Sequence, residues 1–242
     1  MKTLKTGLIF FVALTAFTGL RAQTADEIVN KYIAAIGGKD KLNSIKTVYL
    51  ESSIEVMGNE ASSNTYIVNG KAYKSETDFG GQKIIQCITE KGGWMINPMM
   101  GQTTAEELPK EQLKGSQAQF QVGGALVDYA AKGTTVELLG KEDVNGVSAY
   151  KLKLTTKDSA IVTYYIDPTT YYALKAVTII NANGQQAETS IVFSNYQKTD
   201  FGYVISMVQQ LNLPQGISLT ITNKKVEINK EIDPKIFEMP KS

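Results

Sequence analysis

The residues of this chain that could carry out acid–base chemistry are carboxylates, because its 242 residues include no histidine. Without an imidazole, neither a Ser-His-Asp nor a Cys-His arrangement can form. Zinc sites draw on several Cys and His ligands, and Cys87 is the only cysteine. A pair of carboxylates could still hydrolyse a glycosidic bond, but the acidic residues are scattered along the polar faces of predicted strands. We therefore expect no enzymatic activity, no catalytic residue, no metal and no cofactor.

Nucleotide and nucleic-acid chemistry also lack support in the sequence. We find no Walker-type loop and no dinucleotide fingerprint, and Gly92-Gly93 and Gly123-Gly124 fit turns or close packing. Arg21 is the only arginine in the chain. Nucleic-acid binding needs a basic surface, usually with arginine for phosphate and base contacts. We expect no nucleic-acid partner.

The first 22 residues have the three-part order of a secretory signal peptide. Lys2 and Lys5 form a positive start, 8–20 is an apolar run, and Ala22 suits cleavage before Gln23. The apolar run is shorter than the roughly 20 residues that span a bilayer. Removing Lys2, Lys5 and Arg21 from the 25 basic residues leaves 22 against 24 acidic ones, a net charge of about −2. We expect a mature protein of residues 23–242 in the periplasm, or secreted. With one cysteine, its fold must depend on a hydrophobic core.

An apolar cluster is the strongest candidate for a binding site. The segment 94–100 contains the only Trp and three of the seven Met residues. Methionine is flexible and polarisable, so a cluster of it can line a site that accepts varied apolar groups. Core filling at the end of a strand explains the same cluster.

Four tyrosines offer a second, weaker candidate. Tyr164, Tyr165, Tyr171 and Tyr172 could form a platform that stacks against a sugar or a peptide. Tyrosine is also common in ordinary strands, because its ring suits a half-buried surface.

The mature chain is predicted to begin with helices. Thr24 and Glu27 form a capping box. The apolar residues from Ile28 to Ile36 recur at helical spacing, and Gly37-Gly38 ends the helix. A short helical turn over 39–44 follows.

From Ile45 onward most of the chain alternates apolar and polar residues, as half-buried strands do. Asn-Gly pairs at 69–70, 145–146 and 183–184 favour tight hairpins. We predict a mainly β fold with a few helices (α+β): about ten or eleven strands in one curved antiparallel meander. The segment 101–133 is rich in Gln, Glu, Lys and Gly, and we expect it to leave the sheet as an excursion with helix-like stretches at 110–114 and 125–131.

This layout resembles the LolA/LolB-like periplasmic proteins. The similarity rests on the helix that ends in Gly-Gly, the long meander with central strands at 146–154 and 161–167, the mid-chain excursion, and the closing segment 233–240. The resemblance implies an unclosed β-barrel covered by short helices that act as a lid, with acyl chains held between sheet and helices. Combined with the apolar clusters, it suggests the following lining or lid residues: Trp94, Met95, Ile96, Met99, Met100, Phe120, Leu126 and Val127.

The resemblance also narrows the function. The lipoprotein carrier of that family holds its lid with an arginine, and the acceptor form bears a lipid on a cysteine. This mature chain has no arginine, and no cysteine lies near the predicted cleavage point. We predict a monomeric periplasmic binding or carrier protein for a hydrophobic or acylated ligand other than a shuttled lipoprotein, serving an outer-membrane or envelope protein. The alternative is a non-catalytic structural or interaction module of the cell envelope.

Overall fold

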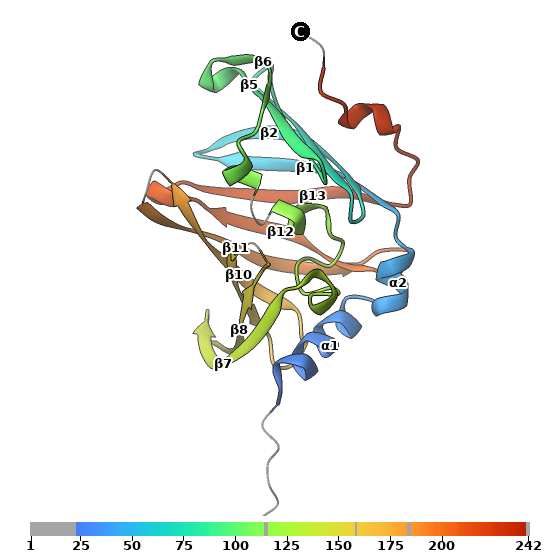
Figure 1. Ribbon diagram of the computed structural model, residues 1–242, viewed down its shortest axis with the longest axis vertical. Coiled ribbons are helices and arrows are strands. Elements are labelled where there is room, and N and C mark those ends of the chain that lie inside the picture. Colours follow the sequence, from blue (N-terminus) through green and yellow to red (C-terminus); the bar gives the residue numbers. More distant parts are fainter. Residues whose placement is uncertain (1–22, 114–115, 158, 183–184, 241–242) are drawn as a thin grey trace, which may run out of the picture.

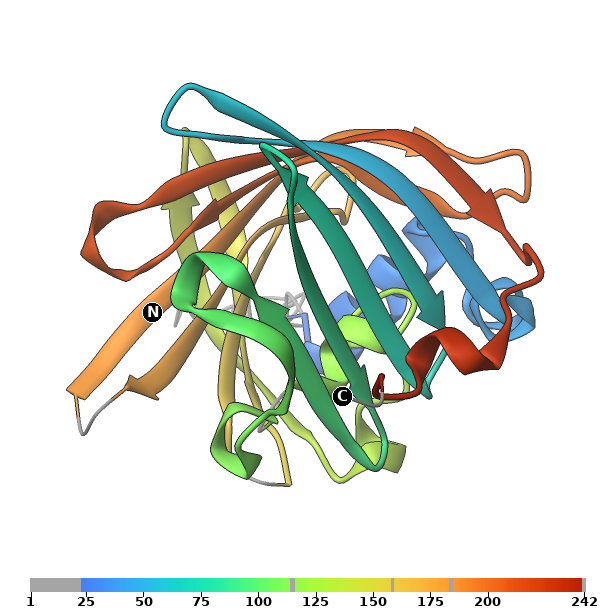
Figure 2. The ribbon, with the colours of Figure 1, turned by 90° about the horizontal axis from the view of Figure 1, so that it is seen from above.

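The computed structural model describes residues 23–240 except 114–115, 158 and 183–184. It shows a strongly curved sheet with helices inside the curve (Figures 1 and 2). The predicted signal peptide, 1–22, and the predicted turn at Asn183-Gly184 lie outside the described residues. No helix among the described residues is long and apolar enough to cross a membrane.

The sheet contains thirteen antiparallel strands in the described residues. They are β1 (Thr47–Val56), β2 (Asn59–Val68), β3 (Ala72–Phe79), β4 (Gln82–Thr89), β5 (Gly92–Asn97), β6 (Gln102–Glu107), β7 (Thr135–Val144), β8 (Val147–Thr155), β9 (Ile161–Ile166), β10 (Ala173–Ala182), β11 (Gln185–Lys198), β12 (Val204–Asn212) and β13 (Ser218–Ile228). The unclosed antiparallel barrel that the sequence predicted is confirmed, but the predicted number of strands was too low.

The order of strands shows how the sheet curls. Two meanders, β1 to β6 and β7 to β13, meet where β1 pairs with β13. The two outer edges, β6 and β7, do not pair with each other. The barrel is therefore open between β6 and β7. Because these two strands are consecutive in the chain, the segment 108–134 connects the two edges of this opening. Figure 2 shows part of this segment inside the curve.

Two α-helices precede the sheet: α1 (Ala25–Ala35) and α2 (Lys39–Ser44). The predicted capping box is present, because the Glu27 amide donates to Thr24 Oγ1 and the Thr24 amide donates to Glu27 Oε2, both at 3.2 Å. Gly37 and Gly38 adopt positive φ angles at the end of α1, as predicted. The turns at Asn69-Gly70 and Asn145-Gly146 also join neighbouring strands as predicted.

The excursion differs from its predicted form. Residues 102–107 belong to the sheet as strand β6. The helix-like stretch predicted at 110–114 is a 3₁₀ helix over its described residues 110–113, and the one predicted at 125–131 consists of turns that lead into a 3₁₀ helix at 130–132; neither is an α-helix. The chain instead makes short 3₁₀ turns, which suit a Gly-rich segment that lacks enough length for a stable α-helix. The 3₁₀ helices are η1 (Pro98–Met100), η2 (Lys110–Leu113), η3 (Ser116–Phe120), η4 (Ala130–Lys132), η5 (Pro214–Gly216) and η6 (Pro234–Phe237).

The main core lies between the sheet and the helices. α1 and α2 contribute Ile28 and Leu42, Ile36 follows directly after α1, and the excursion contributes Leu126. They pack on the concave side of β8 and β9, where Leu152 is fully buried. Cys87 on β4 is inaccessible to solvent, and burial raises the pKa of its thiol to about 11.

Candidate functional site

The concave face of the sheet is the candidate binding face, and the helices cover only part of it. On β1, Val48 and Leu50 pack against the main core. Because side chains alternate along a strand, Ser52, Ile54 and Val56 continue the same face toward the β1–β2 turn. They lie at the end of the sheet away from α1 and α2.

Six half-buried apolar side chains at this end form what we call the open concave patch. Ile54 and Val56 stand opposite Ile221 and Leu219 of β13. The strand pairing from β1 through β2 and β3 to β4 and β5 places Ile84 of β4 and Met95 of β5 on the same face. None of them belongs to the two clusters of buried apolar residues. The patch is Ile54, Val56, Ile84, Met95, Leu219 and Ile221.

A row of hydroxyl groups separates the patch from the main core. Ser52, Ser63 and Thr77 are cross-strand neighbours on β1, β2 and β3. Ser52 Oγ donates to Asn223 Oδ1 at 2.8 Å, and the Ser63 and Thr77 hydroxyls lie 3.0 Å apart. Because these polar groups bond to one another, their burial beside apolar residues carries little penalty.

The excursion is attached to the concave face by buried tyrosines. The hydroxyl of Tyr32 on α1 donates to the Gly123 carbonyl oxygen at 2.9 Å. The hydroxyls of Tyr203 and Tyr164 hydrogen-bond with the backbone of Gly123 and Ala125. Burial raises the pKa of all three phenols, that of Tyr203 to about 12. All three hydroxyls are therefore protonated at neutral pH.

The same attachment explains the glycine at position 123. Gly123 has a φ of +81°, and a Cβ there would lie 2.7 Å from Val127 Cγ2 and 3.0 Å from Ile36 Cδ1. Only glycine combines this conformation with such a close approach to the helix. The sequence predicts a turn or close packing at Gly123-Gly124, and the structure shows both.

Trp94 lies on the convex face of the sheet. Its indole Nε1 donates to the Phe237 carbonyl oxygen at 3.1 Å, so the C-terminal segment covers it. Cys87 Sγ contacts the same oxygen at 3.4 Å, and the Lys74 ammonium group lies 5.7 Å from the indole centroid. Figure 2 shows this C-terminal segment outside the curve of the sheet.

The other predicted lining residues lie in three different surroundings. Ile96 shares the convex face of β5 with Trp94, whereas Met95 faces the concave side. Met99 and Met100 lie on η1, with exposed fractions of 57% and 74%. Phe120, Leu126 and Val127 are buried in the excursion, and the last two belong to the main core. The structure therefore does not gather the eight residues into one site, and their contact with a ligand stays a prediction.

Four residues of the open concave patch are recognisable in the sequence as apolar positions of predicted strands. Ile54, Val56, Leu219 and Ile221 occupy alternating positions in predicted strands. Alternation identifies one face of a strand but not whether that face is concave. Ile84 is a further residue that only the strand pairing assigns to this face.

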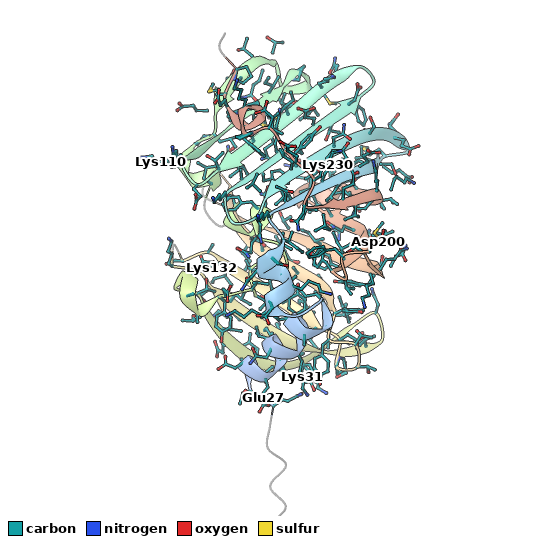
Figure 3. The ribbon with its side chains drawn as sticks, turned by 90° about the vertical axis from the view of Figure 1, so that its right-hand side faces the viewer. Glu27, Lys31, Lys110, Lys132, Asp200 and Lys230 are labelled. Atoms are coloured by element: carbon teal, nitrogen blue, oxygen red, sulfur yellow. The ribbon has the colours of Figure 1, made fainter. Side chains whose placement is uncertain are left out.

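The described residues contain no group of three or more His, Cys, Asp or Glu side chains arranged to hold a metal ion. Some charged residues on the convex side of the sheet form ion pairs. Lys74 with Glu76, at 2.7 Å, and Lys225 with Glu227, at 3.4 Å, are examples. Figure 3 shows the labelled charged side chains around the outside of the molecule.

Comparison with solved structures identifies the fold. A LolA superfamily protein from Nitrosomonas europaea superposes with a TM-score of 0.60 and 14% identity, over 90% of this chain and 98% of its own. A DUF1329 family protein from Desulfovibrio piger gives a TM-score of 0.60 and 16% identity over the same shares of the two chains. A domain named for outer membrane lipoprotein sorting, from Vibrio parahaemolyticus, gives 0.56 and 14%, over 87% and 94%.

No family model matches the sequence, and no curated protein matches it. At identities of 14–16% the structural likeness establishes the fold alone. The fold is LolA-like, as the resemblance in the sequence predicted.

Proposed function

We propose that this chain is a periplasmic binding or carrier protein for a hydrophobic, lipid-like ligand. Residues 23–242 then form one LolA-like half-barrel domain, released from the signal peptide 1–22. The proposed protein is monomeric and non-catalytic, and it delivers its ligand to an outer-membrane or envelope component.

The open concave patch is the observation that carries this proposal. Ile54 and Ile221 are apolar, half-buried and outside the core clusters, on the face that curves inward. Covering such side chains with an acyl chain would remove apolar surface from water, at about 25 cal/mol per Å². The fold of a LolA superfamily protein and of a lipoprotein-sorting domain supports the same class of ligand.

Native mass spectrometry of the protein purified from the periplasm tests the proposal, with an organic extract analysed in parallel. We expect a bound species of lipid mass in the wild type. Ile221→Glu, which charges the open concave patch, should lose that species. Thr220→Glu is the matched control, because the neighbouring residue on β13 faces the convex side opposite Glu55.

Two results would overturn the carrier proposal. One is a clean unliganded mass that does not change when phospholipid or fatty acid is added. The other is equal loss of the bound species in Ile221→Glu and Thr220→Glu when both variants remain as stable as the wild type, because the open concave patch would then have no specific role. Thermal unfolding of both variants shows whether destabilisation caused the loss.

A second candidate function has its own observation. The interior beneath the helices is packed, and Met57, Met99 and Met100 are exposed at strand turns, with Met57 86% accessible. Contiguous exposed apolar patches mark protein interaction sites, so the adjacent pair Met99 and Met100 is the candidate contact. An envelope interaction module would lose its partner in Met99→Ser/Met100→Ser and keep it in Ile221→Glu, whereas a carrier would show the reverse dependence for its ligand.

A further inference from the structure

The hairpin of β7 and β8 folds back over the convex face of the sheet. At its tip, Val144 packs with Ala149, Tyr165 and Val177 in a small apolar cluster of its own. Tyr165 lies on β9 and Val177 on β10, so the hairpin tip covers strands beyond its direct neighbour. A bulge between Leu138 and Lys141 interrupts the pairing of β7 with β8, and bulges bend strands.

This fold-back leaves a hollow of about 200 Å³ between the hairpin tip and the sheet. Tyr165 and Val192 supply its aromatic and aliphatic surface, and Val144 contributes from the hairpin. Since water occupies about 30 Å³ per molecule in the liquid, the hollow has room for roughly seven non-hydrogen atoms.

Opposite charges line the two sides of the hollow. Glu142 and Asp143 come from the end of β7. Lys175, Ser190 and Asn212 come from β10, β11 and β12. An acidic side on the hairpin therefore faces a side on the sheet that offers an ammonium group, a hydroxyl and an amide.

The acidic side is ionised and has oxygens to spare. Glu142 Oε2 accepts from Lys151 Nζ at 2.7 Å, and hydrogen bonds from Lys151 and Tyr165 hold the pKa of Glu142 below its usual value. Asp143 Oδ1 accepts from the Gly146 amide at 3.1 Å, which fixes the carboxylate in the turn. Asp143 keeps a second oxygen that can accept a hydrogen bond, and the lone pairs of the Glu142 carboxylate outnumber the two hydrogen bonds it accepts.

The basic side has donors to spare. Lys175 Nζ lies 5.7 Å from the Tyr165 ring centroid and forms no ion pair within 4.0 Å with a carboxylate of the residues that the structure describes. Ser190, which is 7% exposed, accepts a hydrogen bond from Asn212 Nδ2 at 3.2 Å. Its hydroxyl hydrogen remains available to donate.

We propose that this hollow binds a small zwitterion of the size of a free α-amino acid. The ligand's ammonium group bonds to the carboxylates of Glu142 and Asp143, and its carboxylate bonds to Lys175 and the Ser190 hydroxyl. Because the hollow lies on the convex face, this site is separate from the open concave patch and does not depend on the lipid-binding proposal.

Isothermal titration calorimetry with three probes tests the zwitterion site. Alanine carries both charges, propionate carries only the carboxylate, and ethylamine carries only the ammonium group. All three fit the hollow. We expect alanine to bind at least tenfold more tightly than either single-charge probe, because both charged sides are used only by the zwitterion.

Three variants locate the binding. Lys175→Gln should weaken alanine binding about tenfold or more while leaving ethylamine binding unchanged. Glu142→Gln should weaken alanine and ethylamine together. Val192→Phe fills the hollow from its floor and should abolish binding of every probe. Lys224→Gln, at an exposed lysine on β13 outside the hollow, is the control and should bind alanine like the wild type.

The proposal is overturned if alanine binds no more tightly than propionate and ethylamine, because the paired charges would then have no role. It is also overturned if Lys175→Gln or a folded Val192→Phe protein binds alanine like the wild type. Thermal unfolding of each variant verifies that the hairpin and sheet remain folded. If Glu142→Gln releases the hairpin, Val192→Phe still tests the site, because it fills the hollow without removing a charge.

Discussion

The two ends of the concave face have the same strand geometry but different neighbours. Near α1 and α2, side chains such as Leu152 are fully buried against helices and the excursion. Toward the β1–β2 turn, Ile54 and Ile221 are half-buried and belong to no core cluster. The comparison shows that the same concave face is fully buried where helices and excursion cover it and only half-buried where they do not.

The difference follows from how the excursion is attached. Tyr32, Tyr164 and Tyr203 attach residues 123–125 near the helices, and Leu126 and Val127 then fill the space below. No comparable attachment is described over Ile221. We therefore expect substitutions at the covered end to change stability, and substitutions at the open end to change ligand binding.

The largest expected effect is at the covered end. Leu126 has no exposed surface, so Leu126→Ala should lower the free energy of unfolding by about 3 kcal/mol through lost burial and the cavity left behind. Urea denaturation measures the change. A loss below about 1 kcal/mol would mean that the excursion does not belong to the cooperative core.

The second effect is a loss of stability at alkaline pH. Burial raises the pKa of Tyr203 from 10.0 to about 12 in the folded state. As the pH rises, the unfolded chain therefore loses this proton before the folded protein does. The contribution of Tyr203 to the free energy of unfolding is complete below pH 10 and declines as the pH rises toward 12. At pH 11 the contribution should be about 1.4 kcal/mol smaller than at neutral pH.

Denaturant titrations at pH 8, 10 and 11 measure that decline. Tyr203→Phe removes the ionisable group and should give a shallower fall in stability than the wild type over this range. Identical pH profiles for the two proteins would show that Tyr203 titrates normally and is not enclosed by the excursion.

A smaller effect is expected at the Tyr32 hydroxyl. Tyr32→Phe keeps the ring but leaves the Gly123 carbonyl without its donor, at a cost of about 1 kcal/mol. Hydrogen exchange at 123–127 should accelerate more than exchange in β1 or β13. Tyr66→Phe, on the convex face, is the control, and equal effects in the two variants would argue against a specific attachment.

The smallest stability change belongs to the open end. Ile221→Ala should cost about 1 kcal/mol or less, since its side chain is only half-buried. The same substitution should weaken binding of a fluorescent fatty acid several-fold, whereas Leu126→Ala should affect stability more than binding. A large stability loss with unchanged binding would move Ile221 from the binding surface to the core.

Much of the architecture was predictable because local signals determine it. The capping box of Thr24 and Glu27, the glycines that end α1 and the Asn-Gly turns at 69–70 and 145–146 act within a few residues of one another. Strand alternation then predicts an antiparallel meander. The excursion and its helix-like stretches were predicted, but the type of helix and the inclusion of 102–107 in the sheet were not, because short Gly-rich segments have no strong periodicity.

The candidate site was less predictable. The composition of 94–100 predicted a single apolar site there. Successive strand residues point to opposite faces, however, so Trp94 and Met95 lie on opposite sides of the sheet. The chemistry of each residue was visible in the sequence, but the face it occupies was not.

The sequence by itself determined the alternating strands, the capped first helix, the tight turns and the absence of histidine from any site. Only the tertiary structure decided which strand face is concave, that Phe237 covers Trp94, and that Glu142 and Lys175 line one hollow. The physical reason is the separation along the chain of the residues that interact. Capping, turn formation and alternation depend on neighbours in the chain, whereas curvature and coverage depend on pairing such as that of β1 with β13, between residues about 170 positions apart.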